Sequence, residues 1–241
     1  MTREEILLVA KPILFNTDMV KAILDGRKTA TRRLIKPPYF IDGDESNPKS
    51  ILTLRTAPKG SKIYRQIGKM PYPDKPYKIS DYLYVRETWH VEQIYGNVGT
   101  YGFDCVYKAD EKIVPVITKD IEKYCSWSKF FDRDCWLPSI HMPKEAARIF
   151  LRVTDVRVER LQGMSHDDAL KEGIHYLECP DGFSWKSESD MHCCYISSIG
   201  AMVALWNSTI SKKDMDKYGW HVNPWVWVIE FERVIPEQWE Y

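Results

Sequence analysis

The feature that most constrains the fold is an apolar run near the end of the sequence, from Trp225 to Arg233. In an extended chain, successive side chains point to opposite faces. One face of this run carries Trp225, Trp227, Ile229 and Phe231, and the other carries Val226 and Val228. A strand that is apolar on both faces is typical of the middle of a sheet that is covered on both sides. We therefore predict a central, doubly covered strand over 225–233.

The rest of the chain alternates between strand-like and helix-like patterns. Strands are expected over 11–15, 82–91 and 149–158. Helical spacing occurs over 19–24, between Ser165 and Gly173, and over 199–206. Three stretches show little periodicity and are expected to be loop insertions: 37–77, 92–135 and 175–197. Within the second, a hairpin over 101–107 is the alternative. We predict one α+β domain over residues 1–241, built around a small curved sheet or β-barrel with short flanking helices.

The composition is that of a globular protein with no overall charge. The chain has 241 residues, of which 28% are charged and 44% hydrophobic, and its 34 basic residues balance 34 acidic ones. Zero net charge gives no global electrostatic case for nucleic acid, so any such interaction would be local. No apolar run approaches the ~18 residues of a membrane span, and the first residues lack a signal-peptide layout. We expect a cytoplasmic protein with no membrane partner.

The stretch with the most unusual chemistry is Gly26-Arg27-Lys28-Thr29-Ala30-Thr31-Arg32-Arg33. It follows a short helix for which Gly26 is a natural stop, and it concentrates one lysine, two threonines and three arginines. The helix dipole favours cations just beyond a helix C-terminus. This mixture is typical of a site for an anionic or highly polar ligand, and a solvated basic turn is the alternative interpretation.

Two glutamates lie where a carboxylate is unfavourable unless it is compensated. Glu87 falls on the inward, apolar face of the 82–91 strand, so it needs either a cation or a polar ligand, and Arg33 is a candidate partner. Glu172 falls in the last turn of the helix that Gly173 ends, where a negative charge opposes the helix dipole. Taken alone, an ion pair would explain the first carboxylate and simple exposure the second.

The six cysteines indicate reduced thiols, since none forms a CxxC pair. Five histidines and cysteines form the one grouping with any resemblance to a zinc site: His175, Cys179, His192, Cys193 and Cys194. The adjacent pair Cys193-Cys194 is a poor match to the usual ligand spacings. We therefore predict no metal site and no cofactor, and zinc in this loop is the open alternative.

In combination, these motifs resemble the ASCH domain family, which is related to the PUA domain. The family pattern G-x-K-x-x-x-x-R is matched by Gly26, Lys28 and Arg33. The next family element, K-x-G-D followed by a strand, is similar to Lys78–Val85, where Ser80 replaces the glycine. The chain as a whole resembles the larger, phage- and prophage-associated branch. Further similar segments are 136–143, 153–174 and 223–231.

The resemblance implies a PUA-like β-barrel with a cleft. One small bacterial branch of the family hydrolyses N(4)-acetylcytidine to cytidine and acetate with a lysine, a threonine and a glutamate. These residues correspond to Lys28, Thr31 and Glu172, which we therefore expect to be catalytic and to converge on one cleft. Three further residues are expected to bind the substrate: Arg32, Arg33 and Glu87.

These residue types fit the chemistry of amide hydrolysis without a metal. Thr31 is the first choice as nucleophile, or it holds the water that attacks, and Lys28 can act as the base if burial and nearby cations lower its pKa. Glu172 would orient Lys28 or protonate the leaving amine, and Arg33 would bind substrate or stabilise developing negative charge. We expect the Lys28 ammonium within direct or water-bridged reach of the Thr31 hydroxyl.

Two functions from different classes follow. The first is an amidohydrolase that acts on N(4)-acetylcytidine or a related acylated nucleoside as a small-molecule substrate. The second is an RNA-binding module or ribonuclease, which would use the basic motif for phosphates and aromatic residues for base stacking. In a branch of the family with ribonuclease activity, an acidic residue stands at the position of Thr31, so the threonine favours the first function. The sequence does not indicate an oligomeric state.

Overall fold

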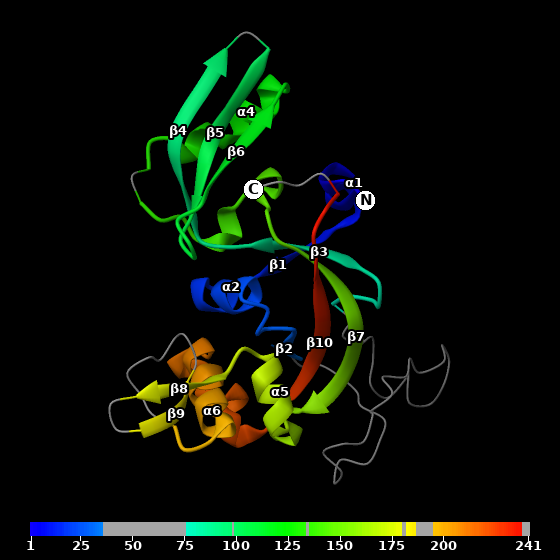
Figure 1. The fold of residues 1–241 in the computed structure, drawn as a ribbon, viewed down its shortest axis with the longest axis vertical. Helices are drawn as coiled ribbons and strands as arrows, with labels where there is room; N and C mark the ends of the chain where they lie inside the picture. Colours follow the sequence, from blue (N-terminus) through cyan, green and yellow to red (C-terminus); the bar gives the residue numbers. More distant parts are fainter. Residues whose placement is uncertain (36–75, 98, 134, 180–181, 187–194, 238–241) are drawn as a thin grey trace. The chain divides into compact units, whose positions relative to one another are not determined.

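The fold is described from a computed structural model of the chain. It describes residues 1–35, 76–97, 99–133, 135–179, 182–186 and 195–237. Within these ranges the protein has α+β structure, with sheets of five, three and two strands accompanied by short helices (Figure 1). The predicted fold class is confirmed at this level. None of the described helices is both long and apolar enough to span a bilayer.

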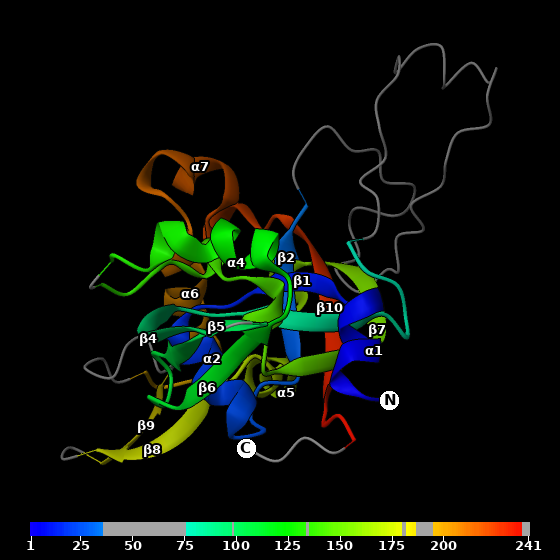
Figure 2. The same ribbon diagram turned by 90° about the horizontal axis from the view of Figure 1, so that it is seen from above.

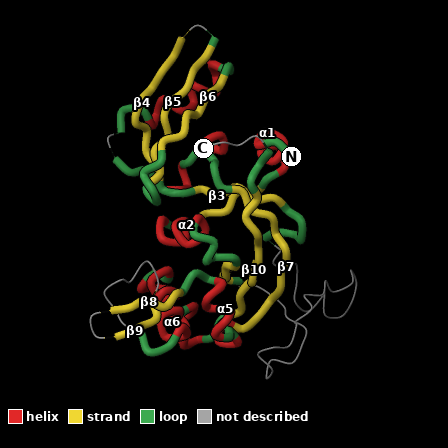
Figure 3. Tube along the Cα trace, in the orientation of Figure 1, coloured by secondary structure: helices red, strands yellow, loops and turns green. Residues whose placement is uncertain are grey.

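The strand order of the largest sheet is β1-β3-β7-β10-β2. Figure 3 shows β7 (Phe150–Arg160) and β10 (Trp225–Val234) as its longest strands, which run side by side. The outermost strands, β1 (Lys11–Leu14) and β2 (Ala30–Leu34), are not paired with each other among the described residues, so no closed barrel is formed there. The observed sheet is therefore open where a small barrel was predicted.

The chain divides into two compact units, each assembled from separate segments. The first comprises Met1–Gly26, Ser80–Arg152 and Glu232–Tyr241, and the second comprises Arg27–Ile79 and Val153–Phe231. The chain thus changes unit within β7 and again within β10. The prediction of a single domain stays a prediction.

The first unit contains one side of the large sheet and the whole three-stranded sheet. Strand β1 pairs in parallel with β3 (Tyr82–Arg86), and β3 pairs antiparallel with the start of β7. The three-stranded sheet is an antiparallel meander of β4 (Trp89–Asn97), β5 (Thr100–Tyr107) and β6 (Ile113–Thr118). The helical elements are α1 (Arg3–Val9), α2 (Thr17–Leu24), α4 (Ile121–Trp127), η1 (Ser128–Phe130), η2 (Ser139–His141) and η3 (Lys144–Ala146).

The meander lies where the sequence predicted an irregular loop over 92–135, so that prediction was wrong. Two features hide the strands. The register shifts between Val91 and Ile94, which breaks the alternation of side chains in β4. Pro115 lies inside β6, and proline is rare in strands except at sheet edges, which is the position of β6. The predicted strand over 82–91 is likewise divided into β3 and β4.

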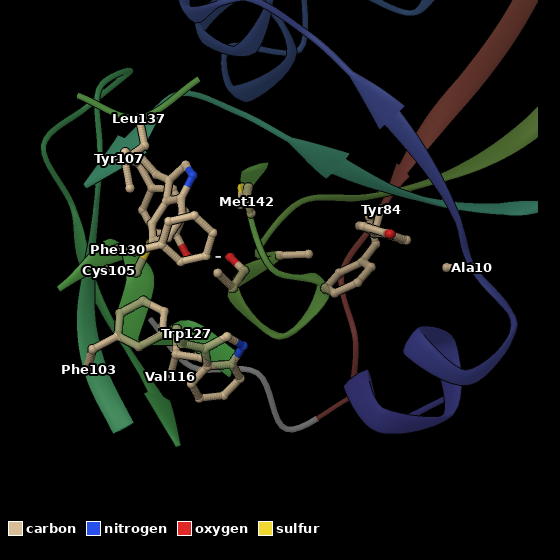
Figure 4. Close-up of a cluster of buried hydrophobic side chains, with 14 of the residues drawn as sticks. Ala10, Tyr84, Phe103, Cys105, Tyr107, Val116, Trp127, Phe130, Leu137 and Met142 are labelled. Atoms are coloured by element: carbon tan, nitrogen blue, oxygen red, sulfur yellow. Dashed lines mark hydrogen bonds between the residues drawn. The ribbon is translucent and has the colours of Figure 1, made fainter. Parts of the chain in front are cut away.

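The core of the first unit is aromatic (Figure 4). Helix α4 and the turn after it cover the meander, and the Phe103 ring lies 5.3 Å from that of Trp127 between centroids. Trp89 contacts both Phe103 and Phe130, at 5.8 and 5.2 Å. Viewed from above, α4 lies over the meander (Figure 2). These contacts join segments that are close in sequence, so the meander and its helix form a local packing unit.

The second unit is built around β10. Strand β2 pairs antiparallel with it, with Thr31 opposite Ile229, and the residues Trp225 to Ile229 are all buried. The prediction of a doubly covered strand is confirmed. Helix α5 (His166–Lys171) and helix α6 (Ser198–Thr209) cover the face that carries Val226 and Val228, through a shared apolar cluster. The remaining elements are η4 (Leu161–Gly163), η6 (Lys212–Asp214), α7 (Met215–Tyr218) and η7 (Trp220–Val222).

The region 175–197 was predicted to be a loop, and its described part is a hairpin. Strand β8 (His175–Cys179) pairs antiparallel with β9 (Gly182–Lys186). The Trp185 ring contacts both Tyr176 and His166, which fixes the hairpin against the start of α5. The loop prediction was therefore wrong for these strands. The predicted loop over 37–77 falls almost entirely outside the described residues.

Candidate active site

The site starts from a helix stop and a short backbone bridge. Gly26 follows α2 with φ = 75°, a left-handed conformation that glycine adopts without strain. The next residues run beside the end of α5, where the Thr29 amide donates to the Lys171 carbonyl at 2.9 Å. Lys28 and Glu172 form an isolated antiparallel bridge. The backbone therefore brings together two segments that are 144 positions apart.

Lys28 and Glu172 form a buried ion pair. The Lys28 Nζ lies 2.6 Å from Glu172 Oε2 and donates to the Glu172 main-chain carbonyl at 3.0 Å. Their side chains are 0% and 3% exposed, so water does not screen the pair. Glu172 is the C-cap of α5, where carbonyls lack helical partners. One ammonium thus neutralises the carboxylate and satisfies the helix end.

This ion pair explains why Glu172 lies at the C-terminus of a helix, which the sequence did not explain. A carboxylate at a helix C-terminus opposes the dipole, and simple exposure was the default interpretation. Ser165 and Asp168 form a capping box at the other end of α5, and Gly173 ends the helix with φ = 100°. Glu172 is instead buried against a cation, as the predicted convergence with Lys28 requires.

Arg32 binds the second oxygen of the same carboxylate. Its Nη1 lies 3.3 Å from Glu172 Oε1, and its Nη2 lies 3.5 Å from Asp168 Oδ1 and 3.6 Å from Glu159 Oε2. The Arg32 side chain is 1% exposed. The structure therefore surrounds Arg32 with carboxylates, although it was predicted to bind substrate.

Thr31 and Arg33 lie on the face of β2 opposite to Arg32, because side chains alternate along a strand. Thr31 is buried, and in the part of the chain that the structure describes its hydroxyl forms no hydrogen bond with Lys28 or Glu172. The direct Lys28–Thr31 contact allowed by the prediction is thus not observed. Thr31 belongs to strand β2.

Burial lowers the pKa of Lys28, and the adjacent Glu172 carboxylate only partly opposes this effect. Arg33 and Arg32 lower the pKa of Lys28 further by charge repulsion. Burial also lowers the pKa of Arg33, which Tyr77 and Glu172 counteract. Lys28 therefore has the direction of shift that a lysine base requires, and Arg33 and Tyr77 lie in the same electrostatic environment.

A second layer of charges surrounds the pair and was not predicted. Arg157 contacts four carboxylates: Asp155, Glu159, Asp168 and Glu230. Glu159 and Asp168 are also the acids that flank Arg32. A local signal did exist, because Asp155, Arg157 and Glu159 alternate at strand spacing in β7. No sequence pattern indicated that Asp168 and Glu230 would also contact Arg157.

Glu87 belongs to the other unit and has a different partner from the one predicted. Its two carboxylate oxygens accept hydrogen bonds from Arg148 Nε and Nη2, each at 2.9 Å, and Asp110 also pairs with Arg148. Burial raises the pKa of Glu87, and the bonds from Arg148 oppose that rise. The expected Glu87–Arg33 pair is therefore wrong. The inward position of Glu87 was correctly predicted, and Arg148, 61 residues away, satisfies it.

The cysteine-rich stretch gives no evidence of zinc in its described part. Among the residues that the structure describes, no cluster of three or more His, Cys, Asp or Glu side chains has metal-binding geometry. His192, Cys193 and Cys194 lie outside the described residues, as does the side chain of Cys179. The remaining candidate, His175, has its Nδ1 3.1 Å from Arg27 Nη1.

Comparison with known proteins adds no family assignment. No family model matches the chain, and neither the curated proteins nor the solved structures contain a match to it. The motif and the geometry of the site are therefore the observations that bear on function.

Proposed function

We propose that the protein is a metal-independent amidohydrolase that acts on N(4)-acetylcytidine or a related acylated nucleoside. One observation carries the proposal: Lys28 and Glu172, 144 positions apart, form a buried pair in which burial lowers the lysine pKa. Strongly perturbed ionisable groups with specific partners are more frequent at functional sites than elsewhere. The PUA-like fold and the ASCH relationship belong to the same proposal.

The proposed chemistry divides amide cleavage between these side chains. Thr31 attacks the acyl carbon, or holds the water that does, and its proton passes to the neutral amine of Lys28. Glu172 accepts the proton of the Lys28 ammonium within the pair and returns it to the leaving amine of cytidine. Arg33 stabilises the negative charge that develops on the acyl oxygen. Where Thr31 is the nucleophile, water then hydrolyses its ester and releases acetate.

The resting geometry defines what substrate binding must change. The Lys28 ammonium forms two hydrogen bonds with Glu172, and among the described residues the Thr31 hydroxyl forms no hydrogen bond with either of them. In ligand-free enzymes, catalytic hydrogen bonds often form only when the substrate is bound. The mechanism therefore requires that substrate binding bring Lys28 and Thr31 into direct or water-bridged contact.

RNA binding is the alternative outcome of the test. Phosphate recognition needs accessible Lys and Arg side chains. Lys28 and Arg32 are buried against carboxylates, and the chain has no net positive charge. These observations favour a small uncharged ligand over an extended phosphate backbone.

Turnover of N(4)-acetylcytidine, followed by the change in absorbance on conversion to cytidine, tests the proposal. Lys28→Met, Thr31→Ala and Glu172→Gln should each reduce turnover by about a hundredfold or more. Lys11→Met is the matched control, because it removes the same charge from a partly exposed pair with Asp81. Activity should survive a chelator. No turnover, together with oligonucleotide binding that weakens steeply with salt, would favour the RNA-binding function.

A further inference from the structure

Arg32 has the geometry of a residue that acts on another side chain. The Glu172 carboxylate lies between two cations, with Oε2 on Lys28 at 2.6 Å and Oε1 on Arg32 at 3.3 Å. A carboxylate held at both oxygens by different partners is fixed in rotation about its last bond, because each rotation would break one contact. Its orientation toward Lys28 therefore depends on Arg32.

The surroundings of Arg32 explain how a second cation is tolerated at this site. Asp168 and Glu159 approach Nη2 at 3.5 and 3.6 Å, which balances the charge of the guanidinium. These distances are too long for strong hydrogen bonds, and the buried Nε and Nη2 have no hydrogen-bond partner in the described structure. The hydrogen bond that Arg32 forms with a carboxylate is the one to Glu172.

The position of Arg32 does not allow a role in substrate binding, whereas the position of Arg33 does. The Arg32 side chain points away from the face of β2 that carries Thr31 and Arg33, the residues that the proposed function assigns to attack and to stabilisation of the acyl oxygen. A residue that contacts substrate must be reachable from the face where the substrate binds.

We propose that Arg32 is a positioning residue, which holds one oxygen of Glu172 so that the other is presented to Lys28. This inference rests on the proposed function for the catalytic roles of Lys28 and Glu172. Without Arg32, the carboxylate turns so that Lys28 can engage both oxygens, and the ammonium gives up its proton less readily. Arg32 therefore contributes to catalysis through Glu172, with no contact to substrate.

Titration of the Lys28 side chain by nitrogen NMR tests the inference without any substrate. Among the described residues, the charged groups that act on the pKa of Lys28 include Glu172, Arg32 and Arg33. Arg32→Gln should raise the pKa of Lys28, because a repelling cation is lost and Glu172 is left to Lys28 alone. Arg32→Lys should give an intermediate value. Arg157→Gln is the matched control: Arg157 contacts the same two acids, Asp168 and Glu159, but not Glu172.

Kinetics separate positioning from substrate binding. Arg32→Gln should lower kcat for N(4)-acetylcytidine by about 10- to 100-fold with KM little changed, and Arg32→Lys should recover part of the loss. A raised KM with kcat retained would overturn the inference, as would an equal shift of the Lys28 pKa in Arg32→Gln and Arg157→Gln.

Two further outcomes remain distinguishable. If the wild type does not hydrolyse the nucleoside, the proposed function fails, and the Lys28 titration still decides the role of Arg32. If neither Arg32 variant folds, proton exchange at the wild-type guanidinium decides it: slow exchange is expected for a group held on Glu172, and exchange at the rate of free arginine would overturn the inference.

Discussion

At the scale of single residues, Lys28 satisfies three electrostatic requirements at once. Its ammonium neutralises a buried carboxylate, binds an unpaired helix carbonyl and lies near two arginines. Leaving one member of a buried pair uncompensated typically costs about 3–5 kcal/mol. Lys28→Met should therefore lower the free energy of unfolding by about this amount, as measured by denaturant titration. A loss similar to that of Lys11→Met, at the exposed pair, would contradict the burial of this ion pair.

The lowered pKa of Lys28 also predicts a pH dependence of stability. Between the folded-state pKa and the ordinary value of 10.5, the unfolded chain binds more protons at this residue than the folded chain does. Stability from this group therefore rises with pH across that window. The difference in unfolding free energy between the wild type and Lys28→Met should widen as the pH rises toward 10.5. A constant difference would show that Lys28 titrates normally in the folded protein.

Contacts between residues could be predicted only where a strand pattern or a family motif pointed to them. The inward phase of Glu87 followed from strand alternation, but nothing in the sequence identified Arg148 as its partner. The meeting of Lys28 and Glu172 was expected from the family resemblance and not from spacing, since each has an ordinary local explanation. The position of Arg32 between three carboxylates required the fold, because Glu159, Asp168 and Glu172 come from the end of one strand and both ends of a helix.

Among the elements, α5 is a short helix whose N-terminus is stabilised by a cap and whose C-terminus positions Glu172. Ser165 and Asp168 close its N-terminus with a capping box, and Glu172 caps its C-terminus. Ser165→Ala should cost about 1 kcal/mol of stability and should also reduce turnover, because fraying of a six-residue helix displaces Glu172. Thr2→Ala is the control, since Thr2 forms the same type of cap on α1. The two variants should lose similar stability in thermal unfolding, and equal turnover in both would contradict the role of α5.

Strand β5 has a close approach that only glycine permits. A Cβ at Gly102 would lie 2.3 Å from the Val116 carbonyl oxygen and 2.8 Å from the Tyr95 ring, whereas one at Gly96 would meet nothing nearer than 3.5 Å. Gly102→Ala should therefore destabilise the protein by about 1–3 kcal/mol. Gly96→Ala should be neutral or slightly stabilising. Equal midpoints for the two variants in denaturant would show that the meander relaxes around the added methyl group.

Elements with a local signal were predicted well, and those defined by pairing were not. Caps and apolar periodicity located α2, α5 and α6. Apolar residues on both faces of the extended run located β10. The meander β4-β5-β6 was missed because a register shift and an edge proline conceal its period. The open sheet order also differs from the predicted barrel, because strand neighbours such as β2 and β10 are set by contacts between distant segments.

At the scale of the whole molecule, the second unit depends on the last strand of the sheet. Strand β2 has β10 as its partner, and they are separated by most of the chain. In a fragment that ends at Pro224, the amides of β2 should exchange rapidly with solvent, because their partner strand is missing. Adding a peptide of residues 225–241 should restore their protection in hydrogen-exchange measurements. Protection of β2 in the fragment alone would mean that another segment pairs with it.

The distance between β2 and β10 also has a consequence for synthesis in the cell. β2 ends at Leu34 and its partner begins at Trp225, so at about 5–20 residues per second the nascent strand waits roughly 10–40 s for its partner. During this interval Lys28 and its neighbours are exposed to chaperones and proteases. The ribosome therefore has to deliver almost the whole chain before the candidate site can form, and a truncated translation product would lack it.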